Sequence, residues 1–224
     1  MIVTIDGPAG SGKSTVARLL ADRLEFDFLN TGAMYRAVAL RCVRGSVDPD
    51  DLDAVARCAH GAVITFPGDR PHLDGEDVTN ELRTEPVSAV ASRIALNPGV
   101  RELLVEMQRA IAAGRNVVTE GRDQGTIVFP QAELKVFLTA SAETRAARRF
   151  AELAALEGHP PDDVTYAGVL DQIRDRDDRD ATRPLAPLKP ADGAVVFDTS
   201  ELTVAQAVDR LEELVRQRRT TGDR

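Results

Sequence analysis

The chain has 224 residues, 36 acidic against 28 basic, and a formal net charge of −8. With 43% hydrophobic and 29% charged residues, the composition excludes a disordered or fibrous chain and predicts a globular protein with a sizeable core. No apolar run approaches the roughly 18–20 residues that span a bilayer, and the N-terminal MIVTIDG lacks the features of a secretory signal. We therefore expect a cytoplasmic protein without a membrane partner, and the acidic surplus argues against a nucleic-acid polymer as partner.

Short apolar runs alternate with amphipathic segments, which predicts strands alternating with helices. The predicted strands are residues 2–5, 28–29, 116–120, 134–138 and 194–198. The predicted helices are residues 13–24, 33–44, 98–113, 142–156, 166–182 and 204–215. This alternation predicts an α/β fold with a parallel sheet covered on both faces, whose ligands bind beyond the carboxyl ends of the strands.

Three other parts of the chain have a different character. Proline and glycine punctuate residues 45–83, where 62–66 and 72–78 are predicted strands joined by a PGDRP turn, so we expect a small inserted β subdomain. The last residues, RQRRTTGDR, are expected to form a frayed tail. Cys42 and Cys58 form no CxxC motif; thiols are the favoured interpretation, and a disulfide is left open.

Residues 7–14 match the pattern G-x(4)-G-K-[ST] between a predicted strand and a predicted helix. Backbone N–H groups of such a loop, together with the positive end of the helix dipole, bind phosphates. Lys13 is expected to bridge the β- and γ-phosphates of a nucleoside triphosphate, and the Ser14 hydroxyl to ligate Mg²⁺ together with those phosphates. The predicted triphosphate-binding residues are Gly7, Pro8, Ala9, Gly10, Ser11, Gly12, Lys13, Ser14 and Thr15.

The rest of the chain indicates what happens to the γ-phosphoryl group. No N/T-K-x-D stretch, which would read guanine, is present. Residues 171–183 instead carry Arg176, Arg179 and Arg183 on one predicted helical face. At spacings of four, Asp180 and Asp175 are expected to hold Arg176 and Arg179. A solvated helix with surface ion pairs is the alternative, but beside a phosphate-binding loop we favour arginines that clamp a transferring phosphoryl group.

Four segments resemble the bacterial cytidylate kinases: VTIDGPAGSGKST, LNTGAMYR, TEGRDQGTIVFP and RDRDDRDATRPLAPL. The resemblance runs over residues 2–214 and implies the fold of nucleoside monophosphate kinases, a five-stranded parallel sheet flanked by helices, with an NMP-binding insert and a LID. It places the CORE at residues 1–30, 84–150 and 184–224, the NMP-binding region with its β subdomain at 31–83, and the LID with the arginine-rich helix at 151–183. The implied reaction is phosphorylation of CMP and dCMP by ATP with Mg²⁺.

The resemblance also implies roles for single residues. Arg36 would hold the monophosphate beside Arg122, and Arg176 would join them when the LID closes. Asp180 and Arg183 would contact the sugar and order the site. The catalytic set is Lys13, Arg122, Arg176 and Arg183. The substrate-binding set is Thr31, Arg36, Ser92, Arg101, Arg122, Asp123, Arg176, Asp180 and Arg183.

Ser92, Arg101 and Asp123 match the positions that read cytosine in this family. A carboxylate suits the N4 amine of cytosine, and a guanidinium suits N3 and O2. The residues alone also permit a plain helix serine at Ser92 and an exposed charge at Arg101.

Two positions depart from the family pattern. Thr31 keeps the hydroxyl of the serine found in some members, and Asn30 stands where aspartate is usual, although its amide oxygen can still accept a hydrogen bond. The alternatives to a CMP kinase are a kinase of another small acceptor, such as UMP or a non-nucleotide hydroxyl, and a non-catalytic nucleotide-binding module. We expect a monomer.

Overall fold

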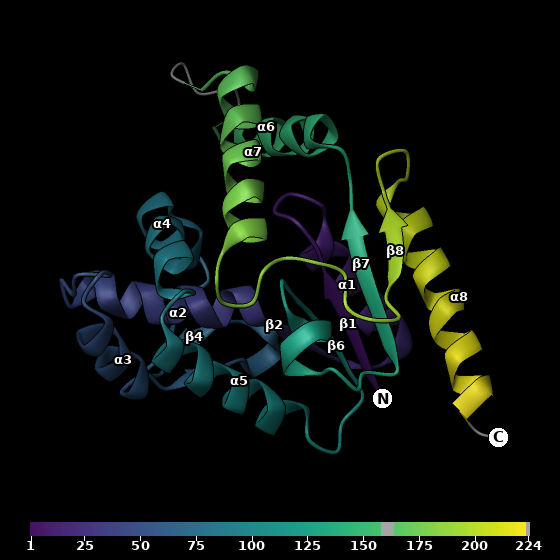
Figure 1. Ribbon diagram of the computed structural model, residues 1–224, viewed down its shortest axis with the longest axis horizontal. Helices are drawn as coiled ribbons and strands as arrows, with labels where there is room; N and C mark the ends of the chain where they lie inside the picture. The colour runs from purple at the N-terminus through teal and green to yellow at the C-terminus, as the bar shows by residue number, and fades with distance from the viewer. Residues whose placement is uncertain (158–163, 223–224) are drawn as a thin grey trace. The chain divides into compact units, whose positions relative to one another are not determined.

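The computed structural model describes residues 1–157 and 164–222 and divides the chain into two compact units (Figure 1). The first unit comprises residues 1–28 and 115–224, and the second comprises residues 29–114. Residues 158–163, which fall within the predicted LID, lie outside the described residues.

A five-stranded parallel sheet organises the fold, with the strand order β2-β6-β1-β7-β8. Its strands are β1 (Ile2–Asp6), β2 (Asp27–Asn30), β6 (Val117–Gly121), β7 (Leu134–Thr139) and β8 (Val195–Asp198). All five lie within a residue or two of the predicted ranges, and the α/β fold class is confirmed. In register, Asp6 at the end of β1 lies beside Gly121 on β6 and Phe137 on β7, so the carboxyl ends of these strands meet at one edge of the sheet.

The α-helices described in the first unit are α1 (Lys13–Leu24), α6 (Ala142–Glu157), α7 (Tyr166–Thr182) and α8 (Val204–Gly222). Helices α1 and α8 pack together over the sheet, and Leu20, Leu138 and Leu211 meet in their shared core. A fully buried leucine side chain contributes about 1.5–3 kcal/mol. Helices α6 and α7 pack against each other around Ala146 and Ile173.

The second unit is mostly helical, with helices α2 (Thr31–Arg44), α3 (Leu52–His60), α4 (Glu85–Ile94) and α5 (Pro98–Ala112). Its antiparallel sheet has the strands β3 (Ile64–Thr65), β4 (His72–Leu73) and β5 (Glu76–Asp77). Short helical turns cover Pro67–Asp69 and Glu81–Arg83. Helix α5 begins as predicted, because the Asn97 side chain accepts hydrogen bonds from the N–H groups of Gly99 and Val100, and Pro98 follows it.

Three ion pairs attach neighbouring elements to α2, and we call them the insert pairs: Arg41–Asp74 and Arg44–Glu76 hold the β4–β5 hairpin of the small sheet, and Arg44–Glu81 holds the helical turn Glu81–Arg83. Both arginines lie in the second half of α2. The side chains are a third to two thirds exposed, so each pair contributes only about 0–1 kcal/mol.

The prediction of one strand over residues 72–78 was wrong, because these residues form the β4–β5 hairpin. Asp74 and Gly75 adopt left-handed φ angles of 53° and 90°, which a two-residue turn of this kind requires. The dipeptide Asp-Gly, which directly follows Leu73, was the available signal. Helices α3 and α4 were also not predicted.

The prediction of a frayed tail was also wrong, because α8 continues through Arg216 to Gly222. Arg216 bonds to Glu212 one turn earlier, and the Arg219 guanidinium lies 4.7 Å from the centre of the Phe26 ring. These contacts stabilise additional helical turns. The final two residues lie outside the described part of the chain.

The compact units do not follow the expected functional boundaries. Residues 84–114, which the resemblance places in the CORE, belong to the second unit, where α4 packs against α2. The assignments of 31–83 to nucleotide binding and of 151–183 to the LID stay predictions. Among the helices of the described ranges, none is long and apolar enough to cross a membrane.

Candidate functional site

The topology of the sheet itself indicates a ligand site between β1 and β6. From β1 the chain runs through α1 to the edge strand β2, whereas from β6 it crosses to β7 on the other side of β1. Open parallel sheets bind ligands outside the carboxyl ends of the strands at such a reversal. The loop 7–12 follows β1 here, and residues 122–128 follow β6.

The loop after β1 has the backbone geometry of a phosphate-binding loop. Gly10 and Gly12 have φ angles of 73° and 88°, in the left-handed region that glycine adopts at little cost. At Gly7 an added Cβ would lie 2.0 Å from the carbonyl oxygen of Leu138, so no side chain fits there. Helix α1 begins at Lys13, which directs its N-terminal N–H groups and dipole toward the loop.

Lys13 is only 5% exposed, and its Nζ donates to the Pro8 carbonyl at 2.6 Å and to Ser11 Oγ at 3.4 Å. Burial lowers the pKa of Lys13 well below its usual value, and the positive charges of Arg122 and Arg176 lower it further. Glu120 and Asp6 oppose this shift. Lys13, Arg122 and Arg176 therefore converge on one region, where a bound polyanion would restore the charge of the lysine.

Ser14 and Glu120 bring two oxygen ligands together. The Ser14 hydroxyl donates to Glu120 Oε1 at 3.0 Å, and the Glu120 side chain is buried at the end of β6. The described residues contain no group of three or more histidine, cysteine, aspartate or glutamate side chains that could hold a metal. A hydroxyl and one carboxylate fit Mg²⁺, which is usually held by one or two protein oxygens together with substrate phosphates and water. Glu120 was quoted in its motif but was not predicted as a site residue.

Asp6 fixes the segment that follows β6. Its carboxylate accepts hydrogen bonds from the backbone N–H groups of Gln124 and Gly125, each at 2.8 Å. Burial raises the pKa of Asp6 to about 6, although both hydrogen bonds favour the ionised form. A π-helical turn, Gln124–Val128, starts here and leaves the buried Asp123 as its first flanking residue.

Arg122 is oriented by α7. Its Nε donates to Asp180 Oδ2 at 3.1 Å, and its Nη1 donates to the Gly121 carbonyl at 3.2 Å. Both side chains of the pair are about one fifth exposed, so part of each remains accessible to a ligand.

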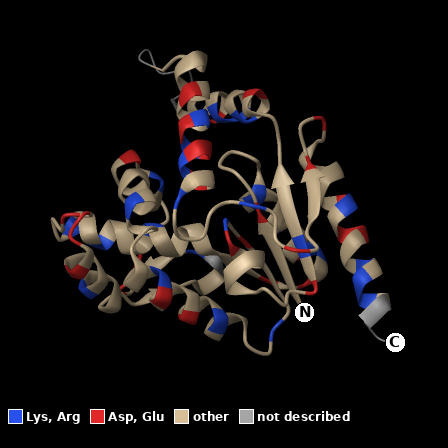
Figure 2. Ribbon diagram, viewed as in Figure 1, with Lys and Arg blue, Asp and Glu red and all other residues tan. Residues whose placement is uncertain are grey.

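Acidic and basic residues alternate along α7, as Figure 2 shows, but several of the predicted contacts differ. Arg179 Nε donates to the backbone carbonyl of Asp175 rather than to its carboxylate. Arg183 lies just beyond the last helical residue and donates to the Ala186 carbonyl, so the prediction that it continues the helical face was wrong. The charged side chains of α7 therefore contact several neighbouring elements.

Two arginines of α6 that the sequence reasoning missed contact the phosphate loop. Arg145 donates to the Ala9 carbonyl at 3.1 Å, and Arg148 donates to the Ser11 carbonyl at 3.4 Å and to the Thr199 carbonyl at 2.7 Å. Arginines three residues apart in the first turns of the helix after β7 were the only available signal.

The predicted site residues of the second unit occupy varied environments. Thr31 is the buried first residue of α2, and the Asn30 amide oxygen caps that helix by accepting from the Ala33 N–H at 3.0 Å. This agrees with the expectation that the amide can replace the usual carboxylate as an acceptor.

Arg36 lies half-buried on α2. Arg101 on α5 is 9% exposed, so the alternative of an exposed charge is wrong for this residue. Ser92 is exposed on α4 and donates to the Ser88 carbonyl at 3.2 Å, as an ordinary helix serine does.

The two cysteines are thiols and lie close together in the second unit. Burial raises the pKa of Cys42 to about 12, and a hydrogen bond with Cys58 acts in the same direction. A thiol with so high a pKa is a poor nucleophile, which fits a structural role.

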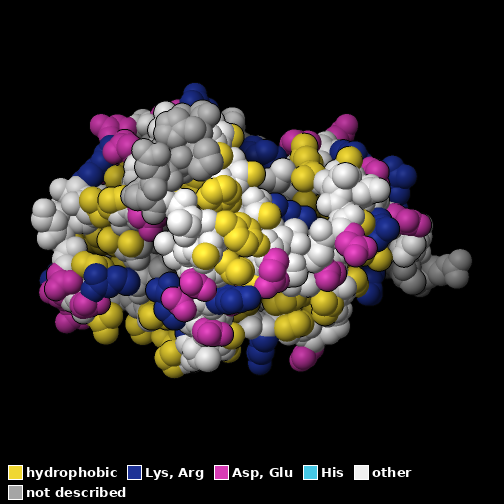
Figure 3. Space-filling view, turned by 90° about the horizontal axis from the view of Figure 1, so that it is seen from above, with side chains coloured by type: hydrophobic (Ala, Val, Ile, Leu, Met, Phe, Trp, Pro, Cys, Tyr) yellow, Lys and Arg dark blue, Asp and Glu magenta, His cyan; other side chains and the backbone are white. Residues whose placement is uncertain are grey.

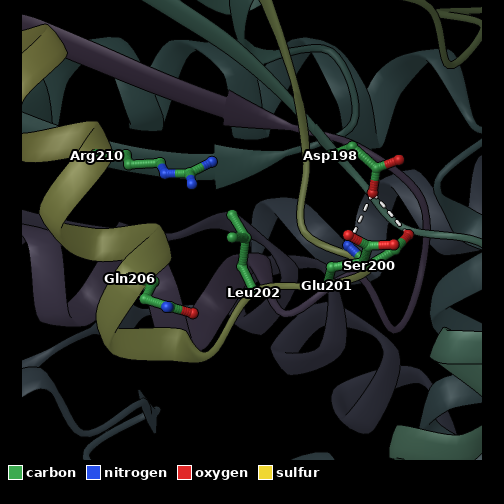
Figure 4. A pocket seen from close by; sticks show the side chains of 6 residues that line it. All are labelled: Asp198, Ser200, Glu201, Leu202, Gln206 and Arg210. Carbon is green, nitrogen blue, oxygen red and sulfur yellow. Dashed lines mark hydrogen bonds between the residues drawn. The ribbon is translucent and has the colours of Figure 1, made fainter.

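A separate hollow lies at the end of β8 and the start of α8 (Figure 4). Its lining residues are Asp198, Ser200, Glu201, Leu202, Gln206 and Arg210. The Asp198 carboxylate accepts from the Ser200 N–H and hydroxyl, which holds the pKa of Asp198 below its usual value. Two carboxylates in the lining make this hollow unsuitable for the phosphates themselves.

The glycine loop between strand and helix, on a parallel sheet, defines a P-loop fold of the kind that binds nucleotide phosphates. Among solved structures, shikimate kinase from Bacteroides thetaiotaomicron matches with a TM-score of 0.51 at 16% identity, covering 96% of this chain and 98% of that one. This likeness supports the fold alone.

Sequence comparisons identify the family. The family model described as cytidylate kinase matches residues 3–217. A cytidylate kinase of Mycobacterium avium is 48% identical over 223 residues, which cover 97% of this chain and 96% of the relative. One from Caldanaerobacter subterraneus is 45% identical, with coverage of 96% and 94%. The chain therefore belongs to the cytidylate kinase family.

Proposed function

We propose that the protein transfers the γ-phosphoryl group of ATP to CMP and dCMP, forming ADP and CDP or dCDP. Family membership supports the reaction class, and the structural observation that carries the proposal is the phosphate loop with its buried Lys13, together with Arg122 after β6 held by Asp180 of α7.

The acceptor in this reaction is a phosphate oxygen, so no strong general base is needed. Catalysis then consists of positioning the two substrates and of neutralising the charge on the phosphoryl group during its transfer. Lys13 donates to the β- and γ-phosphates when it turns from the Pro8 carbonyl, and the loop N–H groups hold the remaining oxygens. Arg122, oriented by Asp180, and Arg176 stabilise the developing charge, with Arg183 completing the predicted catalytic set.

We assign Mg²⁺ to the Ser14 hydroxyl and the Glu120 carboxylate, because these are the paired oxygen ligands beside the loop. Ser14 and Glu120 would hold Mg²⁺, and a bound ion would supply positive charge that offsets the charge of the phosphates. Glu120 also orients the Ser14 hydroxyl before any ligand is bound.

Recognition of cytosine is assigned to Asp123, Arg101 and Ser92. A buried carboxylate accepts from the N4 amine, and a guanidinium donates to N3 and O2. Uracil reverses the hydrogen-bonding pattern at positions 3 and 4, which leaves buried groups unpaired. Arg36 is assigned to the monophosphate, and Thr31, Asp180 and Arg183 complete the substrate-binding set.

The proposal also covers the partners and the location. We propose a cytoplasmic monomer whose partners are mononucleotides, with no nucleic-acid polymer and no membrane. On the face that Figure 3 presents, acidic and basic side chains are interspersed, so this face offers no broad basic patch for a polyanion.

The test is turnover of CMP, dCMP, UMP and AMP under the same MgATP concentration. We expect CMP and dCMP to be turned over at least tenfold faster than UMP and AMP. Preferred turnover of UMP would instead establish a kinase of another acceptor. No product with any monophosphate would establish a non-catalytic module.

A further inference from the structure

Arg145 is a buried arginine that joins three elements of the first unit. It lies in the first turns of α6 and is 4% exposed. Its Nε donates to the Ala140 carbonyl just after β7 at 2.9 Å, and its Nη1 donates to the Ala9 carbonyl of the phosphate loop at 3.1 Å. Nη1 and Nη2 also bind the two carboxylate oxygens of Asp177 on α7, at 3.0 and 2.6 Å.

The Arg145–Asp177 contact has features that fix the relative position of the helices it joins. A bidentate arginine–carboxylate pair fixes both distance and orientation, unlike a single ion pair. The pair is largely buried, and the carbonyl contacts satisfy the remaining face of the guanidinium, which offsets the cost of desolvating the charge. A Cβ at Gly10 would lie 3.3 Å from Arg145 Cβ, so the loop backbone packs directly on this residue.

Asp177 lies in the part of α7 that carries proposed phosphate-binding groups. Arg176 is its neighbour in sequence, and Asp180, three residues later, orients Arg122. Arg145 bonds both to the Ala9 carbonyl of the phosphate loop and to Asp177, so this part of α7 lies beside that loop. The Arg145–Asp177 pair thus connects that loop to α7.

We propose that Arg145, acting through Asp177, is a positioning residue that fixes α7 against the phosphate loop and so places Arg176 at the phosphoryl group in transfer. This inference rests on the proposed function. Neither Arg145 nor Asp177 needs to touch a substrate for it to hold.

A matched control is available on the same two helices. Arg174 on α7 binds Glu143 on α6 at 3.0 Å, but both side chains are more than half exposed. This pair also joins α6 to α7, and within the described part of the chain neither of its side chains bonds to the phosphate loop. Glu143→Gln therefore removes an α6–α7 ion pair without the proposed positioning.

The main variant is Asp177→Asn, which keeps the shape of a side chain that is about one quarter exposed. We expect kcat for CMP to fall about 10- to 100-fold, because small misplacement of a catalytic group has effects of this size. Glu143→Gln should leave kcat within twofold of the wild type. Equal losses in the two variants, or a kcat within twofold in Asp177→Asn, would overturn the proposal.

A double-mutant cycle with Arg176→Gln distinguishes positioning from a purely structural role. If Asp177 acts by placing Arg176, then Asp177→Asn should change kcat by less than threefold in the Arg176→Gln background. Multiplicative losses would contradict this. Thermal unfolding confirms that each variant is folded.

Asp177→Glu serves if the asparagine variant does not fold, because it keeps the negative charge beside Arg145 and moves it by one methylene. It should be folded and show a smaller loss of kcat, with the same dependence on Arg176. A kcat equal to that of the wild type would count against the proposal.

The wild type, measured in the same assay, separates failure of the proposed function from failure of the positioning role. Inactive wild type defeats the proposed function, whereas active wild type with unaffected variants defeats only the positioning role.

Discussion

The two units hold their functional elements by different kinds of interaction. Around the phosphate loop, charged groups are buried and satisfied by backbone and bidentate hydrogen bonds, as at Asp6 and Arg145. In the second unit, the small sheet and the turn Glu81–Arg83 are attached to α2 by the exposed insert pairs. Removing one partner of a buried pair costs about 3–5 kcal/mol, against about 0–1 kcal/mol for an exposed pair. Loss of a single contact is therefore expected to have a large effect at the phosphate loop and a small effect at the insert.

The largest expected effect is the loss of phosphoryl transfer in Lys13→Ala. Removing the charge that meets the β- and γ-phosphates should lower kcat/KM for CMP at least about 1,000-fold, or about 4 kcal/mol. Because burial lowers the pKa of Lys13, removing the amine should not decrease the stability of the protein without nucleotide. A coupled ADP-release assay and thermal unfolding measure the two effects. Near-normal turnover would show that the buried lysine is only structural.

Asp123→Ala tests whether the buried carboxylate beside the phosphate site reads the base. The ratio of kcat/KM for CMP to that for UMP should fall about 10- to 100-fold, because only cytosine offers the N4 amine as a donor. Ser92→Ala compares a second base-reading residue: its hydroxyl is exposed and bonds within its own helix, so this variant should change the ratio less than Asp123→Ala does. Equal losses for CMP and UMP in Asp123→Ala would assign this residue to folding rather than to specificity.

Asp6 gives a prediction about pH. Its folded pKa of about 6 lies above the usual 3.8, so between these values the folded state binds more protons than the unfolded state. The contribution of Asp6 to the free energy of unfolding therefore falls as pH rises through this range. Relative to Asp6→Asn, the wild type should lose about 2 kcal/mol between pH 4.5 and 7. Urea unfolding at both pH values measures this, and the opposite slope would contradict it.

The smallest effect is expected at the insert pairs. Arg44→Gln should lower the free energy of unfolding by less than about 1 kcal/mol, and the difference should shrink further in 1 M salt. Turnover of CMP should remain within twofold of the wild type. A loss of several kcal/mol, or of activity, would remove the distinction between the two units.

Features formed by residues close together in the sequence could be predicted, whereas contacts between residues far apart in the sequence could not. Residues 7–14 were identified because all their backbone donors are contiguous, and the strands because apolar runs mark them locally. The bonds of Asp6 to residues 118 and 119 positions away leave no such pattern. The same holds for Arg145, whose partners come from the phosphate loop and from α7. Helix spacing suggested Asp175 as a side-chain partner of Arg179, but helical neighbours compete with backbone carbonyls and with other elements.

The packing of α8 on α1 has a consequence for how the protein is synthesised. Leu211 and Val215 complete the core that also contains Val3 and Leu20. The core around β1 and α1, which are synthesised first, is therefore complete only after α8 has been synthesised, nearly 200 residues later. The second unit occupies one uninterrupted stretch, 29–114, and has no such requirement within itself. Because contacts distant in sequence form slowly, we expect the second unit to acquire structure on the ribosome while the phosphate loop remains unformed until α8 emerges.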